Sequence, residues 1–106
     1  MDELNAEMIQ EIVQRTVATS HPEKIILFGS RARGDARPAS DLDLLVIAND
    51  LRPRSRRAAD IYRVLSDILF PMDIVVYQPA EIEEWQNVPQ AFVTTAVHEG
   101  TVLYEN

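Results

Sequence analysis

The chain has 106 residues, which is enough for one domain over residues 1–106 and too few for a two-domain enzyme. Its composition, 46% hydrophobic and 25% charged with no long apolar run, is typical of a folded protein that crosses no membrane, and its net charge of -7 argues against general nucleic-acid binding. The sequence has no cysteine and begins with an acidic, amphipathic segment, which excludes disulfides and does not resemble a secretory signal, so we expect a cytoplasmic protein.

The first part of the chain predicts a helix, a strand and a loop. Apolar side chains recur every three or four residues from Glu3 to Ala18, as an amphipathic helix requires. Residues 24–28 (KIILF) form an apolar run too short for a helix, and Gly29 closes it, which indicates a buried strand. Residues 29–40 are small, charged and turn-forming, so we expect a loop that opens with a short helical turn.

The middle of the chain predicts two more strands with a helix between them. Residues 42–48 are rich in strand-forming residues and end at a turn signal, Asn49-Asp50. Apolar residues from Ala58 to Leu69 fall on one face of a helix that Pro71 ends. Residues 72–77 (MDIVVY) carry a single charge and predict the third strand.

The last third predicts two short helices and a fourth strand. Residues 79–85 and 89–98 each begin with a proline, which is favoured in the first turn of a helix, and Gly100 ends the second of them. Residues 101–104 predict the final strand. Such short segments bury enough surface only when the strands share a sheet that the helices cover, so the order predicts an α/β or α+β domain.

Two aspartates at the second predicted strand are the first candidates for chemistry. Asp41 and Asp43 are separated by one residue, so an extended backbone projects both carboxylates from one face of the sheet. Hard oxygen ligands of this kind suit Mg²⁺ or Mn²⁺, as one ion or as two ions about 4 Å apart. Asp73 joins them if the third strand lies beside the second; alone, it is better interpreted as a partly exposed residue at a strand start. Three carboxylates without a cation would repel one another and raise their pKa values.

Gly29 and Ser30, directly after the first predicted strand, are candidates for holding an anion. Glycine allows a ligand to approach the backbone closely, and free amides with a serine hydroxyl form an anion-binding concavity. Arg31 and Arg33 follow, and either of them could contact phosphate or pair with Asp35. The alternative is a helix cap with surface arginines. Together with two acids that follow after ten intervening residues, however, these groups supply what a metal-bound nucleoside triphosphate needs.

A second group of basic residues follows the second predicted strand. It consists of Arg52, Arg54, Arg56 and Arg57. Arginine suits phosphate through its planar, bidentate fork, so a local anion site is one interpretation. We prefer the other interpretation, a solvated face with ion pairs.

The run from 29 to 44, GSRARGDARPASDLDL, resembles the signature of the minimal nucleotidyltransferase family, in the superfamily of DNA polymerase beta and the aminoglycoside nucleotidyltransferases. The family pattern is met in full by Gly29, Ser30, Ala32, Arg33, Gly34, Ser40, Asp41, Asp43 and Leu44. The resemblance implies a nucleotidyltransferase fold with a small mixed sheet covered by helices. It implies that Asp41 and Asp43 bind metal, and Asp73 matches the third acid by its position along the fold. Residues expected to bind the nucleotide are Gly29, Ser30, Arg31, Arg33 and Ser40.

The resemblance also implies a function. It indicates a metal-dependent enzyme that moves AMP from ATP to an acceptor, with two Mg²⁺ ions expected and Mn²⁺ as an alternative. Stand-alone members of the family are often encoded beside a helical HEPN ribonuclease toxin, and are thought to neutralise it by transferring AMP to a tyrosine. We therefore expect a protein adenylyltransferase that acts as an antitoxin, with a HEPN-type toxin as its partner.

Two other functions remain open on the sequence alone. One is an antitoxin that masks a toxin by binding it, with a vestigial or regulatory nucleotide site. The other is transfer to a small molecule, which the absence of an acceptor-binding domain disfavours. A partner could dock on the apolar residues of the last third, which otherwise pack on the sheet: Trp85, Val88, Phe92, Val93 and Val97.

Overall fold

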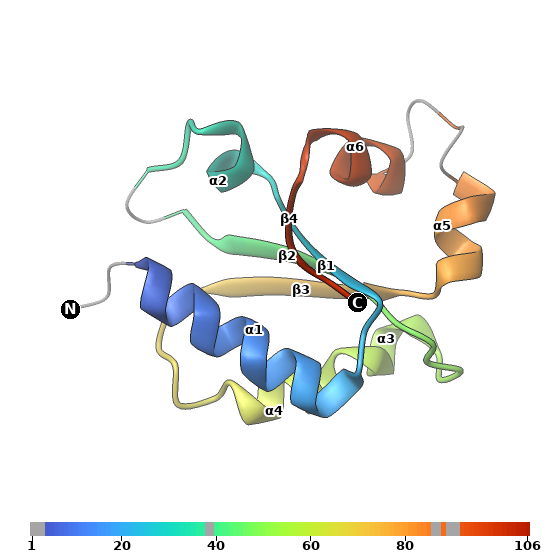
Figure 1. The fold of residues 1–106 in the computed structure, drawn as a ribbon, viewed down its shortest axis with the longest axis horizontal. Helices are drawn as coiled ribbons and strands as arrows, with labels where there is room; N and C mark the ends of the chain where they lie inside the picture. The colour runs from blue at the N-terminus through green and yellow to red at the C-terminus, as the bar shows by residue number, and fades with distance from the viewer. Residues whose placement is uncertain (1–3, 38–39, 86–87, 89–91) are drawn as a thin grey trace.

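The structure is a computed structural model that describes residues 4–37, 40–85, 88 and 92–106. Helices and strands follow one another as Figure 1 shows: α1 (Ala6–Ser20), β1 (Lys24–Phe28), α2 (Ser30–Arg33), β2 (Leu42–Ile47), α3 (Arg54–Arg57), α4 (Ala59–Val64), β3 (Met72–Tyr77), α5 (Pro79–Trp85), α6 (Phe92–Glu99) and β4 (Thr101–Glu105). Among the helices of these residues, none has the length and apolar character needed to cross a bilayer.

The four strands form one mixed sheet in the order β3-β2-β1-β4. β1 pairs antiparallel with both β2 and β4, while β2 and β3 run parallel, connected by α3 and α4. The expected α/β class with a small mixed sheet is therefore confirmed. Since the parallel pair starts at Leu42 and Met72, residues at the beginnings of these two strands lie side by side.

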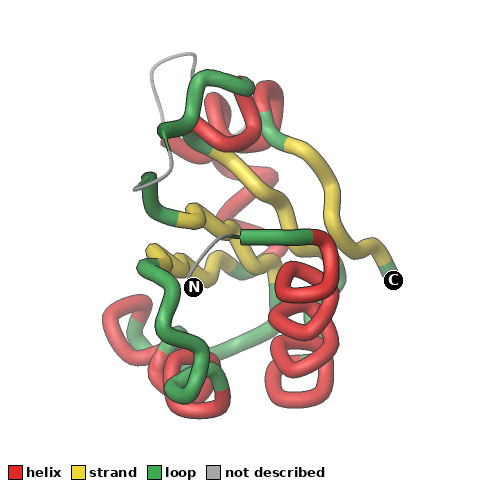
Figure 2. The backbone as a smooth tube through the Cα atoms, turned by 90° about the vertical axis from the view of Figure 1, so that its left-hand side faces the viewer, coloured by secondary structure: helices red, strands yellow, loops and turns green. Residues whose placement is uncertain are grey.

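Helices cover both faces of this sheet, as Figure 2 shows from the side. Side chains alternate between the faces along each strand, which divides the apolar residues into two cores. One core lies under α1 and α4 and contains Ile12, Ile25, Leu42, Leu44, Val46, Ile61, Leu65, Ile74 and Val76, among others. The other lies under α5 and α6 and contains Ile26, Leu45, Ile47 and Ala96, with Phe28, Val75, Tyr77, Ile82 and Val97 packed against it.

The predicted helix over residues 58–69 is shorter than its apolar pattern indicated. The structure has α4 over Ala59–Val64 and a turn after it, where the Leu65 amide donates to the carbonyl oxygens of both Ile61 and Tyr62. Leu69, expected on the buried face, is 84% exposed. The apolar periodicity predicted the wrong helix end because Leu65 lies in a turn and Phe70 in a loop. Both side chains are buried, although they do not belong to one continuous helix.

The other expected elements agree with the structure to within a few residues. The first helix begins at Ala6, after the Asn5 side chain caps it by accepting from the Met8 amide at 2.8 Å; the expected start at Glu3 lies outside the described residues. The last helix begins at Phe92, and its expected first residue, Pro89, also lies outside the described residues.

Candidate functional site

The parallel pairing of β2 and β3 brings two of the three candidate acids side by side. Asp43 and Asp73 are register partners, so their side chains leave the sheet on the same face. This is the face with Leu45 and Val75, two residues further along each strand, which belong to the core under α5 and α6. Asp41 precedes β2 by one residue. Asp41 and Asp73 are exposed, while Asp43 is partly buried between them and the loop after β1.

The electrostatics of Asp43 reflect this crowding. Burial raises the pKa of its carboxyl above the usual value, and the negative charges of Asp73 and then Asp41 raise that pKa further. Arg33 opposes these effects and lowers the same pKa. The mutual repulsion expected of three neighbouring acids is therefore present at Asp43, and a cation placed between the carboxylates would relieve it.

Gly29 holds the backbone of the loop directly against Asp43. Its φ of 78° and ψ of -159° are disfavoured for residues with a side chain. A Cβ atom at this position would collide with Oδ2 of Asp43. Because Phe28 is the register partner of Asp43 across β1 and β2, the chain turns immediately beside the carboxylate. Glycine is thus required here both by conformation and by space.

The short helix α2 follows this turn. The amides of Ala32 and Arg33 both donate to the Gly29 carbonyl oxygen at 3.1 Å, and the Asp35 amide donates to the Ser30 carbonyl oxygen at the same distance. Gly34 ends the helix in the left-handed conformation, with φ of 82°. These hydrogen bonds fix Ser30 at the first position of α2, one residue after the glycine that touches Asp43.

The two arginines of α2 lie in different environments. Arg31 donates from Nε and Nη2 to the Ser40 carbonyl oxygen, at 3.2 and 2.9 Å, and its guanidinium lies 5.0 Å from the centre of the Phe70 ring. It therefore ties α2 to the residue that precedes Asp41. Arg33 is half exposed and pairs with Asp35 at 3.5 Å, as the sequence allowed for one of the two. The charge of Arg33 also lowers the pKa of Asp43.

Ser40 links the loop to this framework. Its hydroxyl oxygen accepts from the Arg37 amide at 2.9 Å, and its amide donates to the Arg37 carbonyl oxygen at the same distance. Its own carbonyl oxygen holds Arg31. These hydrogen bonds orient the chain as it enters β2. They give the hydroxyl oxygen, the amide and the carbonyl oxygen of Ser40 partners within the protein.

The chemistry of the donors fits a hard divalent cation, although the side chains do not form a ready-made cage. Carboxylate oxygens are the ligands that Mg²⁺ and Mn²⁺ prefer, and Asp43 carries an electrostatic penalty that such an ion would remove. Among the residues that the structure describes, no group of three or more acidic or histidine side chains is already gathered around one point. The residues that would hold the ion are Asp41, Asp43 and Asp73.

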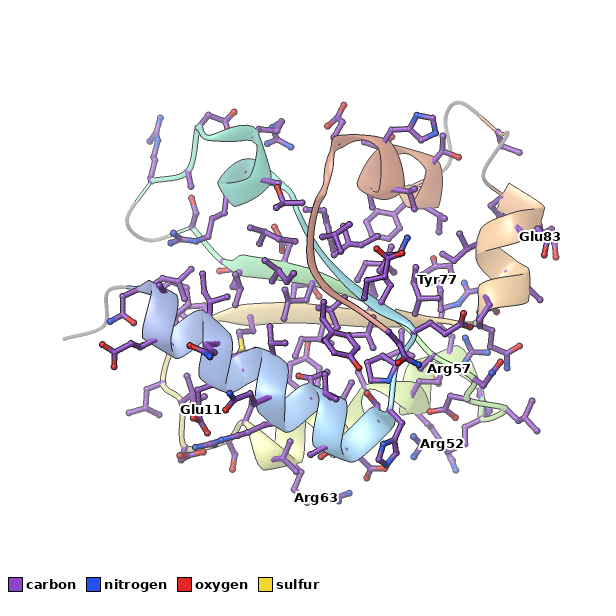
Figure 3. All side chains as sticks on the ribbon, in the orientation of Figure 1. Glu11, Arg52, Arg57, Arg63, Tyr77 and Glu83 are labelled. Carbon is purple, nitrogen blue, oxygen red and sulfur yellow. The ribbon has the colours of Figure 1, made fainter. Side chains whose placement is uncertain are left out.

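Three members of the second arginine group, Arg52, Arg54 and Arg57, form ion pairs at the other end of the sheet. The preferred interpretation, a solvated face with ion pairs, is confirmed for Arg52 and Arg54 but is wrong for Arg57, which is buried. Figure 3 shows Arg52 and Arg57 near the ends of β2 and β3, away from α2. Arg57 is buried and donates to Oε1 of Glu81 at 2.6 Å, and Arg52 pairs with Asp50 at 2.6 Å. Sequence reasoning indicated ion pairs but missed the role of Glu81, whose partners are distant in sequence.

Sequence comparisons point to one enzyme family. The family model described as "Polymerase beta, Nucleotidyltransferase" matches residues 7–106. MJ1305 of Methanocaldococcus jannaschii, which carries the provisional name of a protein adenylyltransferase, is 56% identical over 45 residues. This match covers 42% of the chain and spans only 29% of that relative's length.

Several solved structures have the same fold. A Sulfolobus solfataricus protein provisionally described as a nucleotidyltransferase gives a TM-score of 0.65 at 22% identity, over 94% of this chain and 82% of that one. A toxin–antitoxin structure with AMP-PNP gives 0.65 at 20% identity, over 92% and 73% of the chains. A mutant of the toxin–antitoxin pair MntA-HpeT gives 0.61 at 21% identity, over 97% and 75%. At these identities the likeness establishes the fold alone.

Proposed function

This chain belongs to the polymerase beta nucleotidyltransferase family, and on that premise we propose that it transfers AMP from ATP to a hydroxyl group of a protein. One observation carries the proposal: Asp43 lies in register with Asp73 on a sheet face where the Gly29 backbone touches the same carboxylate. Acidic ligands and a backbone turn suited to phosphate are thus adjacent, as a metal-bound nucleoside triphosphate requires.

The proposed reaction is an in-line displacement at the α-phosphorus of ATP. The acceptor oxygen forms a bond to that phosphorus, the bond to the bridging oxygen breaks, and pyrophosphate leaves. Gly29 and Ser30 hold the triphosphate, and Arg33 neutralises part of its charge. Asp73 accepts the proton of the acceptor hydroxyl. Asp41, Asp43 and Asp73 would hold the divalent cations, with two Mg²⁺ ions expected, which would neutralise charge on the phosphates and lower the pKa of the acceptor hydroxyl.

The position of Asp73 is accessible to a macromolecular acceptor. β3 is an edge strand of the sheet, and Asp73 is exposed at its start. A hydroxyl presented by a second protein can therefore approach the proposed base from outside the domain. The names of the relatives, a protein adenylyltransferase and toxin–antitoxin pairs, support the same choice. We propose that the acceptor is a tyrosine of a HEPN-type toxin, which this chain neutralises.

The proposal predicts label transfer in trans. The purified chain is incubated with Mg²⁺, the protein encoded beside it, and ATP labelled at either the α or the γ phosphate. We expect the α label to appear on the neighbouring protein, located on tyrosine by peptide mass spectrometry, with release of one pyrophosphate for each AMP. Transfer of the γ label would contradict the reaction, and neutralisation of the toxin without any label would instead support masking by binding.

A further inference from the structure

A pocket of about 260 Å³ opens beyond the aspartates, under α5 and α6. Among the described residues it is lined by Arg54, Tyr77, Trp85, Phe92 and Val93. Tyr77 follows Asp73 by four residues on β3, so both side chains leave the sheet on the same face, about 13 Å apart along the strand. Figure 3 shows Tyr77 close to α5. The pocket and the carboxylates therefore share one side of the sheet.

A row of three aromatic rings extends from the carboxylates to the pocket. Phe28 is the register partner of Asp43, so the row begins beside the partly buried carboxylate. The Phe28 and Phe92 rings meet edge to face with centroids 5.0 Å apart, and the Phe92 and Tyr77 centroids are 6.2 Å apart. Phe92, at the start of α6, is thus the central ring between the carboxylates and the pocket.

The walls of the pocket present flat, accessible surfaces. Trp85 and Phe92 are each 42% exposed, although both belong to helices that pack on the sheet. The guanidinium of Arg54 lies 4.4 Å from the centre of the Tyr77 ring, which adds a planar cation to the wall. The Thr94 hydroxyl donates to the Trp85 carbonyl oxygen at 2.7 Å and fixes the end of α5 against α6. Exposed rings held in place in this way are suited to stacking on another flat ring.

We infer that this pocket receives the base of the nucleotide, an inference that rests on the proposed function. The pocket lies just below the size range of sites that enclose a whole drug-sized ligand, which fits one ring system. With the phosphates beside Gly29, the ribose follows the aromatic row and the base stacks on Phe92. Purines are favoured over pyrimidines because the larger ring system covers more of these walls.

Trp85 provides a direct test, since it is the only tryptophan of the chain. Its fluorescence is followed while the protein is titrated with Mg²⁺ and either ATP, CTP or tripolyphosphate, which has no base. We expect saturable quenching by ATP, weaker binding of CTP, and no quenching by tripolyphosphate, which nevertheless competes with ATP. Quenching by tripolyphosphate equal to that by ATP would contradict a base in the pocket.

Variants of Phe92 give the second readout. Phe92→Leu should weaken ATP binding about tenfold, because stacking on an aromatic side chain contributes on the order of 1–3 kcal/mol per base. Phe92→Tyr should keep the affinity for ATP, and tripolyphosphate should bind both variants as it binds the original protein. Leu69→Ala, at an exposed site outside the pocket, serves as the control.

The outcomes separate this inference from the proposed function. If AMP transfer proceeds while Trp85 does not respond and Phe92→Leu binds ATP normally, the base lies elsewhere and the enzyme assignment stands. If neither ATP nor tripolyphosphate binds, both the inference and the proposed function are overturned. If Phe92→Leu impairs docking of the acceptor protein but not binding of ATP, the pocket serves the acceptor and the inference is wrong.

Discussion

Replacing Asp43 by Asn is expected to reduce the proposed AMP transfer by on the order of 10³-fold or more, because the variant loses a carboxylate that we propose binds the metal. The side chain keeps its size, so the packing against Gly29 is retained. Transfer is measured by α-labelled ATP on the acceptor protein. Glu83→Gln is the control, since Glu83 is an exposed acid on α5 that points away from the sheet (Figure 3). Transfer by Asp43→Asn at the original rate would remove the proposed metal role.

The same variant should be more stable than the original protein at pH 7. The folded-state pKa of Asp43 is raised, so the folded state binds its proton more tightly than the unfolded state does. The Asp43 carboxyl therefore stabilises the folded state at low pH. This contribution is lost as the pH rises from the pKa of Asp43 in the unfolded state through its raised pKa in the folded state. Asparagine removes this penalty. Mn²⁺ should raise the melting temperature of the original protein and have little effect on Asp43→Asn.

Replacing Glu81 by Gln is expected to destabilise the protein by about 2–3 kcal/mol, which lowers the melting temperature by about 10 °C. Glu81 accepts from the buried Arg57 at 2.6 Å and from the Gln78 amide at 2.7 Å, and it pairs with Arg54 at 3.1 Å. The variant leaves Arg57 buried without its carboxylate. The bond to Gln78 also caps the start of α5.

The pH dependence of unfolding provides the check. Hydrogen bonds from Arg57, the largest effect, lower the pKa of Glu81 to about 2 from its usual 4.5. Its stabilisation is therefore complete above pH 4.5 and is lost as the pH falls from 4.5 towards 2. Thermal unfolding at several pH values should show this loss in the original protein and a smaller one in Glu81→Gln. Equal stability of the two proteins at pH 7 would contradict the role given to Glu81.

The strands could be predicted from sequence because short apolar runs bounded by turn residues have few other interpretations. Residues 24–28 and 72–77 are strands in the structure as predicted. The helix over residues 58–69 could not be predicted correctly, since buried residues of a turn and a helix give the same apolar spacing. Tertiary packing, not local preference, decides where such a helix ends.

The candidate site could be predicted only in part from the sequence. The spacing of Asp41 and Asp43 is local, and it predicts one face for both wherever an extended strand contains them. In the structure β2 begins at Leu42, so only Asp43 is a strand residue. The register of Asp73 with Asp43 depends on a parallel pairing of strands separated by two helices, which no local pattern encodes. The contact of Gly29 with Asp43 and the aromatic row through Phe92 are likewise products of the fold.

The most direct test of this account is where a divalent cation binds. Mn²⁺ is titrated into the isotopically labelled protein, and the loss of backbone amide signals in NMR spectra is followed residue by residue. Paramagnetic broadening falls steeply with distance, so we predict that the first signals to disappear are those of Gly29, Ser30, Asp41, Asp43 and Asp73. Early loss of signals around Glu7 and Glu11 instead, with the amides beside Asp43 unaffected, would contradict a cation site at these three aspartates.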